Sequence, residues 1–129
     1  MLRRTRSTVH DMRRSLGWLC LAAFPALAAA HPHTAGECRE GGDFIRNAAL
    51  ARDNGTTRDF FVGRLEEDFA TIRAFPPALR WFVADAGDER FLRAEVAAVF
   101  DAPQPGDEHR AAFVERCARR SERLSGGAV

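Results

Sequence analysis

The sequence is short of several features that mark common protein classes. It has no lysine, so all nineteen basic residues are arginines, which is typical of a GC-rich genome and indicates no function. No segment alternates polar and apolar residues as a β-strand does, which argues against a β-sheet fold. Without a C-x-x-C pair, a G-x-S-x-G motif or a phosphate-binding glycine loop, the sequence offers no sign of thioredoxin-like, serine-hydrolase or nucleotide-binding chemistry.

Residues 1–30 predict a secretory signal peptide. Five arginines precede a run without charges over residues 16–30, and Ala28 and Ala30 match the A-x-A pattern of a signal peptidase site. We expect cleavage after Ala30, with Ala28 as the alternative site and Met12 as an alternative start of translation. The run is shorter than the ~20 apolar residues of a transmembrane helix. The other interpretation of this segment is a buried N-terminal helix.

Export predicts a periplasmic or secreted protein with no stable membrane anchor after cleavage. Cys20 does not fit a lipoprotein site, because bulky Leu19 precedes it where a small residue is needed. Loss of residues 1–30 removes five of the nineteen arginines and one of the eighteen acidic residues, so the formal charge changes from +1 to −3. A mildly acidic domain with dispersed arginines has no basic patch for nucleic acid.

Cys38 and Cys117 are the two cysteines that remain after cleavage. An even number of cysteines in an oxidising compartment favours one disulfide. This bond would close most of the domain into one loop and contribute ~4.5 kcal/mol in the chain-entropy model. Zinc binding and redox chemistry are the alternatives, but no pair among the cysteines and histidines has zinc-finger spacing.

The spacing of apolar residues predicts an all-α fold, a compact bundle of about five short helices stapled by one disulfide. A polar N-terminal segment is expected over residues 31–42, a helical domain over 43–124 and a flexible tail over 125–129. Asp43 and Asp88 are expected to cap two of the helices. The five helices are expected within residues 43–55, 56–75, 77–87, 88–100 and 107–124.

Three histidines form a candidate metal site: His31, His33 and His109. Cleavage after Ala30 would make His31 the N-terminus, where its amine and ring nitrogen can chelate copper. This arrangement resembles the histidine brace of some copper-dependent secreted proteins. Pro32 has no amide proton, which breaks the amino-terminal copper and nickel motif that His33 would otherwise complete. The alternative is a disordered polar leader that binds no metal.

The adjacent aromatic residues Trp81 and Phe82 predict a surface for a partner or client protein. In a short helix their side chains would point about 100° apart, so one core would not cover both. An exposed aromatic patch suits partner binding. The alternative is that both belong to the core, as most of the phenylalanines do.

Other polar groups are expected to face solvent, and the protein is predicted not to be an enzyme. The acidic run 66–68 interrupts core positions, so most of it is predicted to be solvated. The arginines of residues 116–123 could contact an anionic headgroup or an acidic partner, and an ordinary charged helix face is the alternative. His109 could act as a general base, but no nucleophile can be assigned to it.

The chain combines a signal peptide, one cysteine before the segment FIRNAALARDNG, and a last helix with the segment AAFVERC. This arrangement is similar to that of small exported proteobacterial proteins of uncharacterised function. The layout also resembles that of periplasmic acid-stress chaperones, which are small helical proteins with one long-range disulfide. This resemblance implies a binding or envelope-stress role, with another envelope protein or a client as partner. The resemblance implies no catalytic residue and no cofactor. Copper, considered above, is expected only from the histidines.

Overall fold

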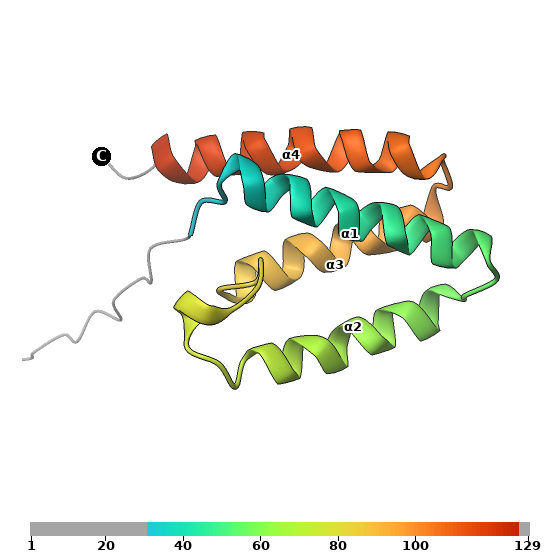
Figure 1. Cartoon of the computed structure of the whole chain (residues 1–129), viewed down its shortest axis with the longest axis horizontal. Coiled ribbons are helices and arrows are strands. Elements are labelled where there is room, and N and C mark those ends of the chain that lie inside the picture. The colour runs from blue at the N-terminus through green and yellow to red at the C-terminus, as the bar shows by residue number, and fades with distance from the viewer. Residues whose placement is uncertain (1–30, 127–129) are drawn as a thin grey trace, which may run out of the picture.

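The computed structural model describes residues 31–126 as an all-α fold (Figure 1). Within this range there are four α-helices and one turn of 3₁₀-helix, so the all-α class is confirmed and the expected count of about five helices is wrong. The predicted signal peptide, residues 1–30, lies outside the described residues, as do residues 127–129 of the predicted tail. The elements are α1 (Ala35–Asp53), α2 (Arg58–Ile72), η1 (Pro77–Leu79), α3 (Ala86–Asp101) and α4 (Gly106–Gly126).

Helix α1 begins at Ala35, eight residues before the expected start at Asp43. A reciprocal capping box sets this start: the Glu37 amide donates to Thr34 Oγ1 (3.1 Å), and the Thr34 amide donates to Glu37 Oε2 (2.7 Å). The expected polar segment 31–42 is therefore helical from residue 35 onward. At the other end of the chain, α4 continues to Gly126, two residues past the expected end of the helical domain.

The helix expected over residues 77–87 is reduced to the 3₁₀ turn η1, followed by an irregular loop. The Arg80 guanidinium donates to the carbonyl oxygens of Phe75 (2.8 Å), Ala84 (2.9 Å) and Arg73 (3.1 Å) and so fixes the loop without helical hydrogen bonds. Helix α3 then starts at Ala86, capped by Asp85. The predicted cap, Asp88, instead lies inside the first turn of α3 and is fully buried.

Helices α1 and α4 form the closest pair, and a disulfide joins them. Cys38 and Cys117 are at bonding distance, with Cα atoms 5.6 Å apart, which confirms the predicted pairing. Glycine makes the approach possible: a Cβ on Gly41 would come within 2.6 Å of Phe113 Cε1, and one on Gly42 within 2.8 Å of Val114 Cγ2. The small residues hold the two backbones close enough for the disulfide to form.

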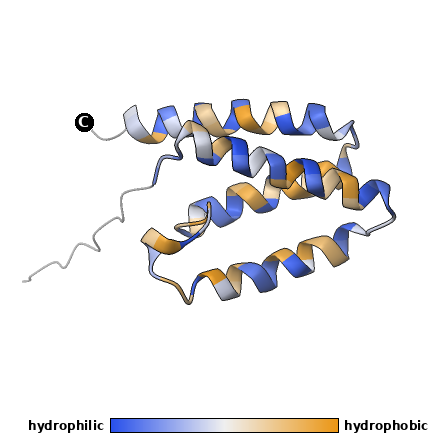
Figure 2. Ribbon diagram, in the orientation of Figure 1, coloured by the Kyte–Doolittle hydropathy of each residue, from blue (hydrophilic) through white to orange (hydrophobic). Residues whose placement is uncertain are grey.

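All four α-helices and the loop of residues 80–85 contribute side chains to one core. Its largest side chains are almost fully buried, among them Phe69, Phe113, Ile45, Leu92, Val96 and Val99. Hydrophilic and hydrophobic residues are interspersed along all four α-helices, as expected of amphipathic helices around one core (Figure 2). None of the helices in residues 31–126 combines the length and the apolar character needed to span a bilayer.

Helix α2 packs closely against α3, whereas α1 and α2 stay apart (Figure 1). The bundle is therefore unevenly closed, with a tight α1–α4 seam and a loose α1–α2 seam. The loop of residues 80–85 lies at one end of this loose seam. It carries Trp81 and Phe82, the two aromatic residues predicted to form a partner-binding surface.

Candidate functional site

The loop of residues 80–85 positions Trp81 and Phe82. A tight turn places the Val83 amide 2.5 Å from the Trp81 carbonyl oxygen, and Phe82, at its centre, has a φ of 52°. This left-handed backbone costs a bulky L-residue about 1–2 kcal/mol. The Phe82 ring offsets this cost by packing against Phe113, with ring centroids 5.7 Å apart, and against His33. The predicted aromatic pair is thus split, because Phe82 is buried and Trp81 is 40% exposed.

His33 is buried beside Phe82, which corrects the expectation of a polar leader at this position. Its backbone amide donates to Ser121 Oγ (3.0 Å), and its Nε2 lies 2.6 Å from the Phe82 carbonyl oxygen. The imidazole stacks on the Phe82 ring with centroids 4.0 Å apart. These contacts attach the start of the described chain to α4 and to the 80–85 loop.

Asp88 brings a carboxylate to the same place. The Ala84 amide donates to its Oδ2 (2.9 Å), and His33 Nε2 lies 3.9 Å from that oxygen. Arg120 Nη1 lies 2.9 Å from Oδ1, an ion pair by distance. The guanidinium N–H is not aligned on Oδ1, so this buried oxygen has no hydrogen-bond partner among the described residues. A buried carboxylate is thus balanced in charge but incompletely bonded.

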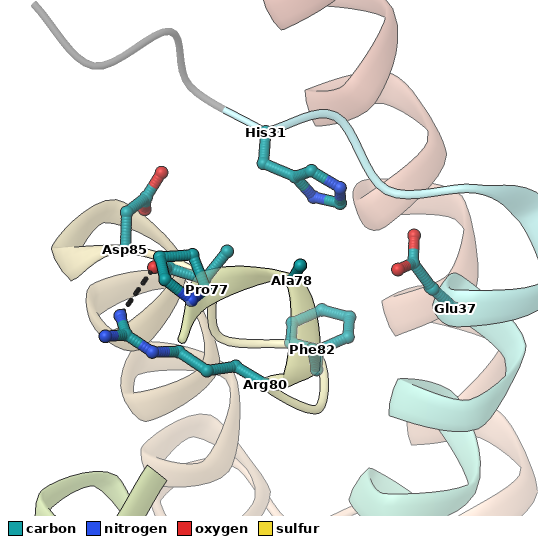
Figure 3. Close-up of a pocket in the computed structure, with 8 residues that line it drawn as sticks. His31, Glu37, Pro77, Ala78, Arg80, Phe82 and Asp85 are labelled. Carbon is teal, nitrogen blue, oxygen red and sulfur yellow. Dashed lines mark hydrogen bonds between the residues drawn. The ribbon is translucent and has the colours of Figure 1, made fainter. Parts of the chain in front are cut away.

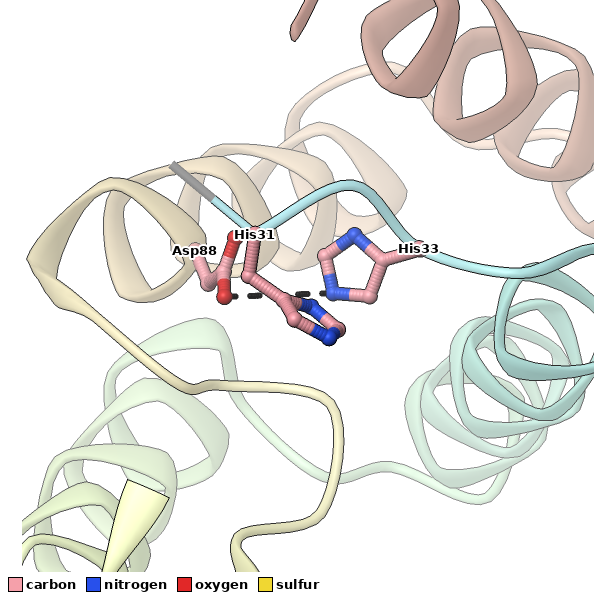
Figure 4. Close-up of side chains that lie close together, drawn as sticks. All are labelled: His31, His33 and Asp88. Carbon is pink, nitrogen blue, oxygen red and sulfur yellow. Dashed lines mark ion pairs between the residues drawn. The ribbon is translucent and has the colours of Figure 1, made fainter. Parts of the chain in front are cut away.

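His31 completes what we call the histidine cluster, which consists of His31, His33 and Asp88 (Figure 4). One potential ligand atom from each residue lies within 4.8 Å of the others. The two imidazoles meet edge to face, with centroids 5.7 Å apart. His31 is exposed, whereas the other two side chains are buried. The cluster therefore has an inner wall fixed by the fold and an outer ligand open to solvent.

A cavity of about 560 Å³ lies beside the histidine cluster (Figure 3). His31 and Phe82 line it on the cluster side. Glu37 and Arg80 add charged groups, and the sticks in Figure 3 show these side chains around one open space. His31 is thus reached directly from solvent.

His109 does not join the other two histidines, so the predicted three-histidine metal site is wrong. It is buried at the start of α4, where its Nε2 accepts a hydrogen bond from the Gln104 amide (3.0 Å) and faces Arg52 Nη1 (3.2 Å). Burial and the positive charges of Arg52 and Arg116 lower the pKa of His109 below its usual value. The His109 ring is neutral and its Nε2 lone pair already accepts a hydrogen bond, so this nitrogen cannot act as a general base. The role of His109 is therefore structural.

The second candidate site is what we call the α1–α2 groove, an apolar depression of about 320 Å³ in the loose seam. Asp68 lies at its edge and is exposed. The apolar residues that line it come from all three nearby helices and the 80–85 loop: Phe44, Leu65, Phe69, Ile72, Leu92 and Trp81.

A continuous aromatic row connects the groove to the histidine cluster. Going from one to the other, centroid distances are 6.0 Å for Phe61–Phe44, 5.5 Å for Phe44–Trp81, 5.6 Å for Trp81–Phe82 and 4.0 Å for Phe82–His33. Aromatic pairs at 4.5–7 Å stabilise each other beyond their buried area. The two candidate sites therefore share one packed column of rings.

Several of the remaining charged groups are paired within the protein. Glu66 accepts hydrogen bonds from Arg93, which lower the pKa of Glu66 below its usual value and keep it ionised. Of the arginines on α4, Arg116 pairs with Glu95 and Arg119 with Glu115. Together with the Arg120–Asp88 pair, these contacts favour an ordinary charged face over a basic docking patch.

Comparisons with known protein families, with curated proteins and with solved structures found no match to this chain. The geometry of the α1–α2 groove and of the histidine cluster is therefore the basis for any assignment of function.

Proposed function

We propose that this protein is an exported, non-enzymatic binding module that holds an apolar side chain of a protein partner in the α1–α2 groove. The observation that carries the proposal is the groove itself, which is lined by six apolar side chains, one of them the partly exposed Trp81. Large aromatic side chains that are partly open to solvent are the usual anchors of protein interfaces.

The loose seam gives this groove its depth. Helix α2 rests on α3 and stays apart from α1, so Phe44 of α1 and Ile72 of α2 face a common space with Leu92 of α3 below it. In a fully packed bundle a neighbouring side chain would fill such a space. An apolar group from a partner can supply the missing packing without rearrangement of the helices.

The size and charge of the groove define the partner. About 320 Å³ is at the small end of binding pockets, which suits one or two side chains better than a large ligand. Asp68 forms no ion pair with the described residues. We therefore expect a segment that combines a leucine or an aromatic residue with a nearby arginine or lysine, as in an exposed segment of a partly unfolded client.

Export is supported by the signal peptide that residues 1–30 predict and by the Cys38–Cys117 disulfide. A domain held by a disulfide keeps its fold in an oxidising envelope, where partly unfolded clients are also present. The envelope-stress role expected from the sequence is consistent with this compartment.

The test is suppression of client aggregation, measured by light scattering after a denatured client is diluted into the protein at neutral pH. We expect the wild-type protein to delay aggregation and Trp81→Ala to remove most of this effect. Leu79→Ala is the matched control, because Leu79 is 72% exposed close by in the chain and does not line the groove. Asp68→Asn should weaken the effect less than Trp81→Ala does.

No suppression by the wild-type protein, or equal loss in Trp81→Ala and Leu79→Ala, would contradict the proposal. Circular dichroism of each variant shows whether the fold is intact, and Trp81 and Leu79 are exposed enough for both variants to fold.

A further inference from the structure

We propose that the histidine cluster is a binding site for one divalent transition-metal ion, with Cu(II) bound most tightly. The site is separate from the α1–α2 groove, so this inference does not depend on the proposed function. Its three ligands are the imidazoles of His31 and His33 and the carboxylate of Asp88.

The distances within the cluster suit a metal ion. Ligand atoms about 2.0–2.2 Å from one ion lie roughly 3–4 Å from one another. His33 Nε2 and Asp88 Oδ2 are already 3.9 Å apart, and all three ligand atoms lie within 4.8 Å of one another. The exposed His31 ring is free to turn toward the other two ligands, whereas the Asp88 carboxylate is held in place by the Ala84 amide.

Asp88 provides a second, independent sign of a ligand. Its Oδ1 is fully buried and has no hydrogen-bond partner among the described residues, although Arg120 balances its charge. Buried polar atoms are nearly always bonded, so an unbonded Oδ1 next to the Oδ2 that lies 3.9 Å from His33 Nε2 suggests an ion that binds this carboxylate through both oxygens. A divalent ion would supply the missing contact more strongly than a misaligned guanidinium does.

Binding requires two local exchanges. The His33 ring gives up its contact of 2.6 Å with the Phe82 carbonyl, and its proton moves from Nε2 to Nδ1 so that Nε2 can bind the ion. Arg120 Nη1 lies 3.5 Å from Nδ1 and must turn away. The guanidinium of Arg120 already lies over the Phe91 ring, 5.0 Å from its centroid, so a second contact is available to it.

The chemistry of the ligands defines the class of ion. Two imidazole nitrogens and one carboxylate oxygen suit copper and zinc, whereas calcium and magnesium prefer oxygen ligands alone. Among divalent ions of the first transition row, Cu(II) forms the most stable complexes with such ligands. Cleavage after Ala30 would add the α-amine of His31 as a fourth donor, and the cavity beside His31 gives the ion a route from solvent.

The experiment uses the protein isolated after export, with its N-terminus read by mass spectrometry and any bound metal removed by a chelator. Cu(II) is titrated in the presence of a competing chelator, and calorimetry gives the affinity and the number of ions bound. We expect one ion per chain and an electron paramagnetic resonance spectrum with nitrogen hyperfine splitting. Zn(II) should bind to the same site more weakly.

His31→Ala is the decisive variant, because an exposed side chain can be removed without loss of the fold. We expect its affinity for Cu(II) to fall by about 10–100-fold. Asp88→Asn keeps the shape of the side chain and should weaken binding as well. His109→Gln is the control, since it removes a histidine outside the cluster and should leave the affinity unchanged.

Failure of the wild-type protein to bind one Cu(II) under chelator competition would overturn the proposal. The same conclusion follows if His31→Ala binds like the wild type, or if His109→Gln lowers the affinity as much as His31→Ala does. Each of these outcomes leaves the test of the α1–α2 groove unaffected.

Discussion

His33 and His109 are both 6% exposed and both lie near an arginine, yet their surroundings give them different roles. His109 Nε2 accepts a hydrogen bond from the Gln104 amide and faces Arg52. Within residues 31–126, no carboxylate forms an ion pair with His109. His33 instead faces the carboxylate of Asp88 and a second imidazole. Burial alone therefore does not identify a functional histidine, and the set of partners does.

The two regions also differ in how they are held together. At the His109 end, Arg52 of α1 donates to the carbonyl oxygen of Val99 in the last turn of α3 (2.7 Å) and to that of Gln104 in the α3–α4 connection (2.8 Å). At the His33 end, the disulfide joins α1 to α4, and Ser121, one turn after Cys117, binds the His33 amide. The first region depends on hydrogen bonds and the second on a covalent bond.

The largest effect is expected from removal of the disulfide. The double variant Cys38→Ser/Cys117→Ser should lower the free energy of unfolding by about 2–5 kcal/mol, because the unfolded chain loses a long closed loop. Denaturant unfolding measures the change. Hydrogen exchange should show that amides near His33 lose more protection than those near His109, and a uniform loss would argue against two separately held regions.

A smaller effect is expected from His109→Ala. The variant leaves the Gln104 amide without its acceptor and removes a buried ring that faces Arg52, so the free energy of unfolding should fall by about 1–3 kcal/mol. His31→Ala is the matched control and should change it by no more than about 0.5 kcal/mol, because His31 is exposed. Equal effects in the two variants would show that the contacts of His109 do not stabilise the fold.

The smallest effect is a dependence of stability on pH. Because burial and two arginines lower the pKa of folded His109, the unfolded chain binds more protons than the folded protein in mildly acidic solution. The contribution of His109 is complete above the unfolded pKa of about 6.5 and is lost as the pH falls from there through the folded pKa. Denaturant titrations between pH 8 and pH 5 should show this loss in the wild type, and His109→Gln should reduce it. An unchanged pH dependence in His109→Gln would rule out His109 as its source.

Features with a local or unique cause could be predicted from the sequence. The all-α class followed from the spacing of apolar residues, and the Cys38–Cys117 pairing followed because the predicted cleavage would leave only two cysteines. The early start of α1 had a local signal as well, since Thr34 and Glu37 have the spacing of a capping box. A polar, glycine-containing stretch concealed that signal.

The histidine cluster could not be predicted, because its partners are distant in the sequence. His33 is buried by Phe82 and Ser121, 49 and 88 residues away, and no local pattern encodes those contacts. An aspartate just before an apolar helical segment is typical of a helix cap, which is why Asp88 was predicted to be one. The structure uses Asp85 as the cap of α3, and this places Asp88 inside the helix, where it is buried. The charged neighbours of His109 in the sequence predict an exposed side chain, whereas its contact with Arg52, 57 residues away, is not encoded locally.

The aromatic row makes Trp81 a built-in optical probe of both sites. It is the only tryptophan in residues 31–126, and it borders the α1–α2 groove while its ring lies 5.6 Å from that of Phe82, which stacks on His33. Its emission should shift to shorter wavelength when an apolar group displaces water beside the indole. A nearby Cu(II) ion should instead quench the emission without a shift, so one fluorescence spectrum can tell which of the two sites is occupied.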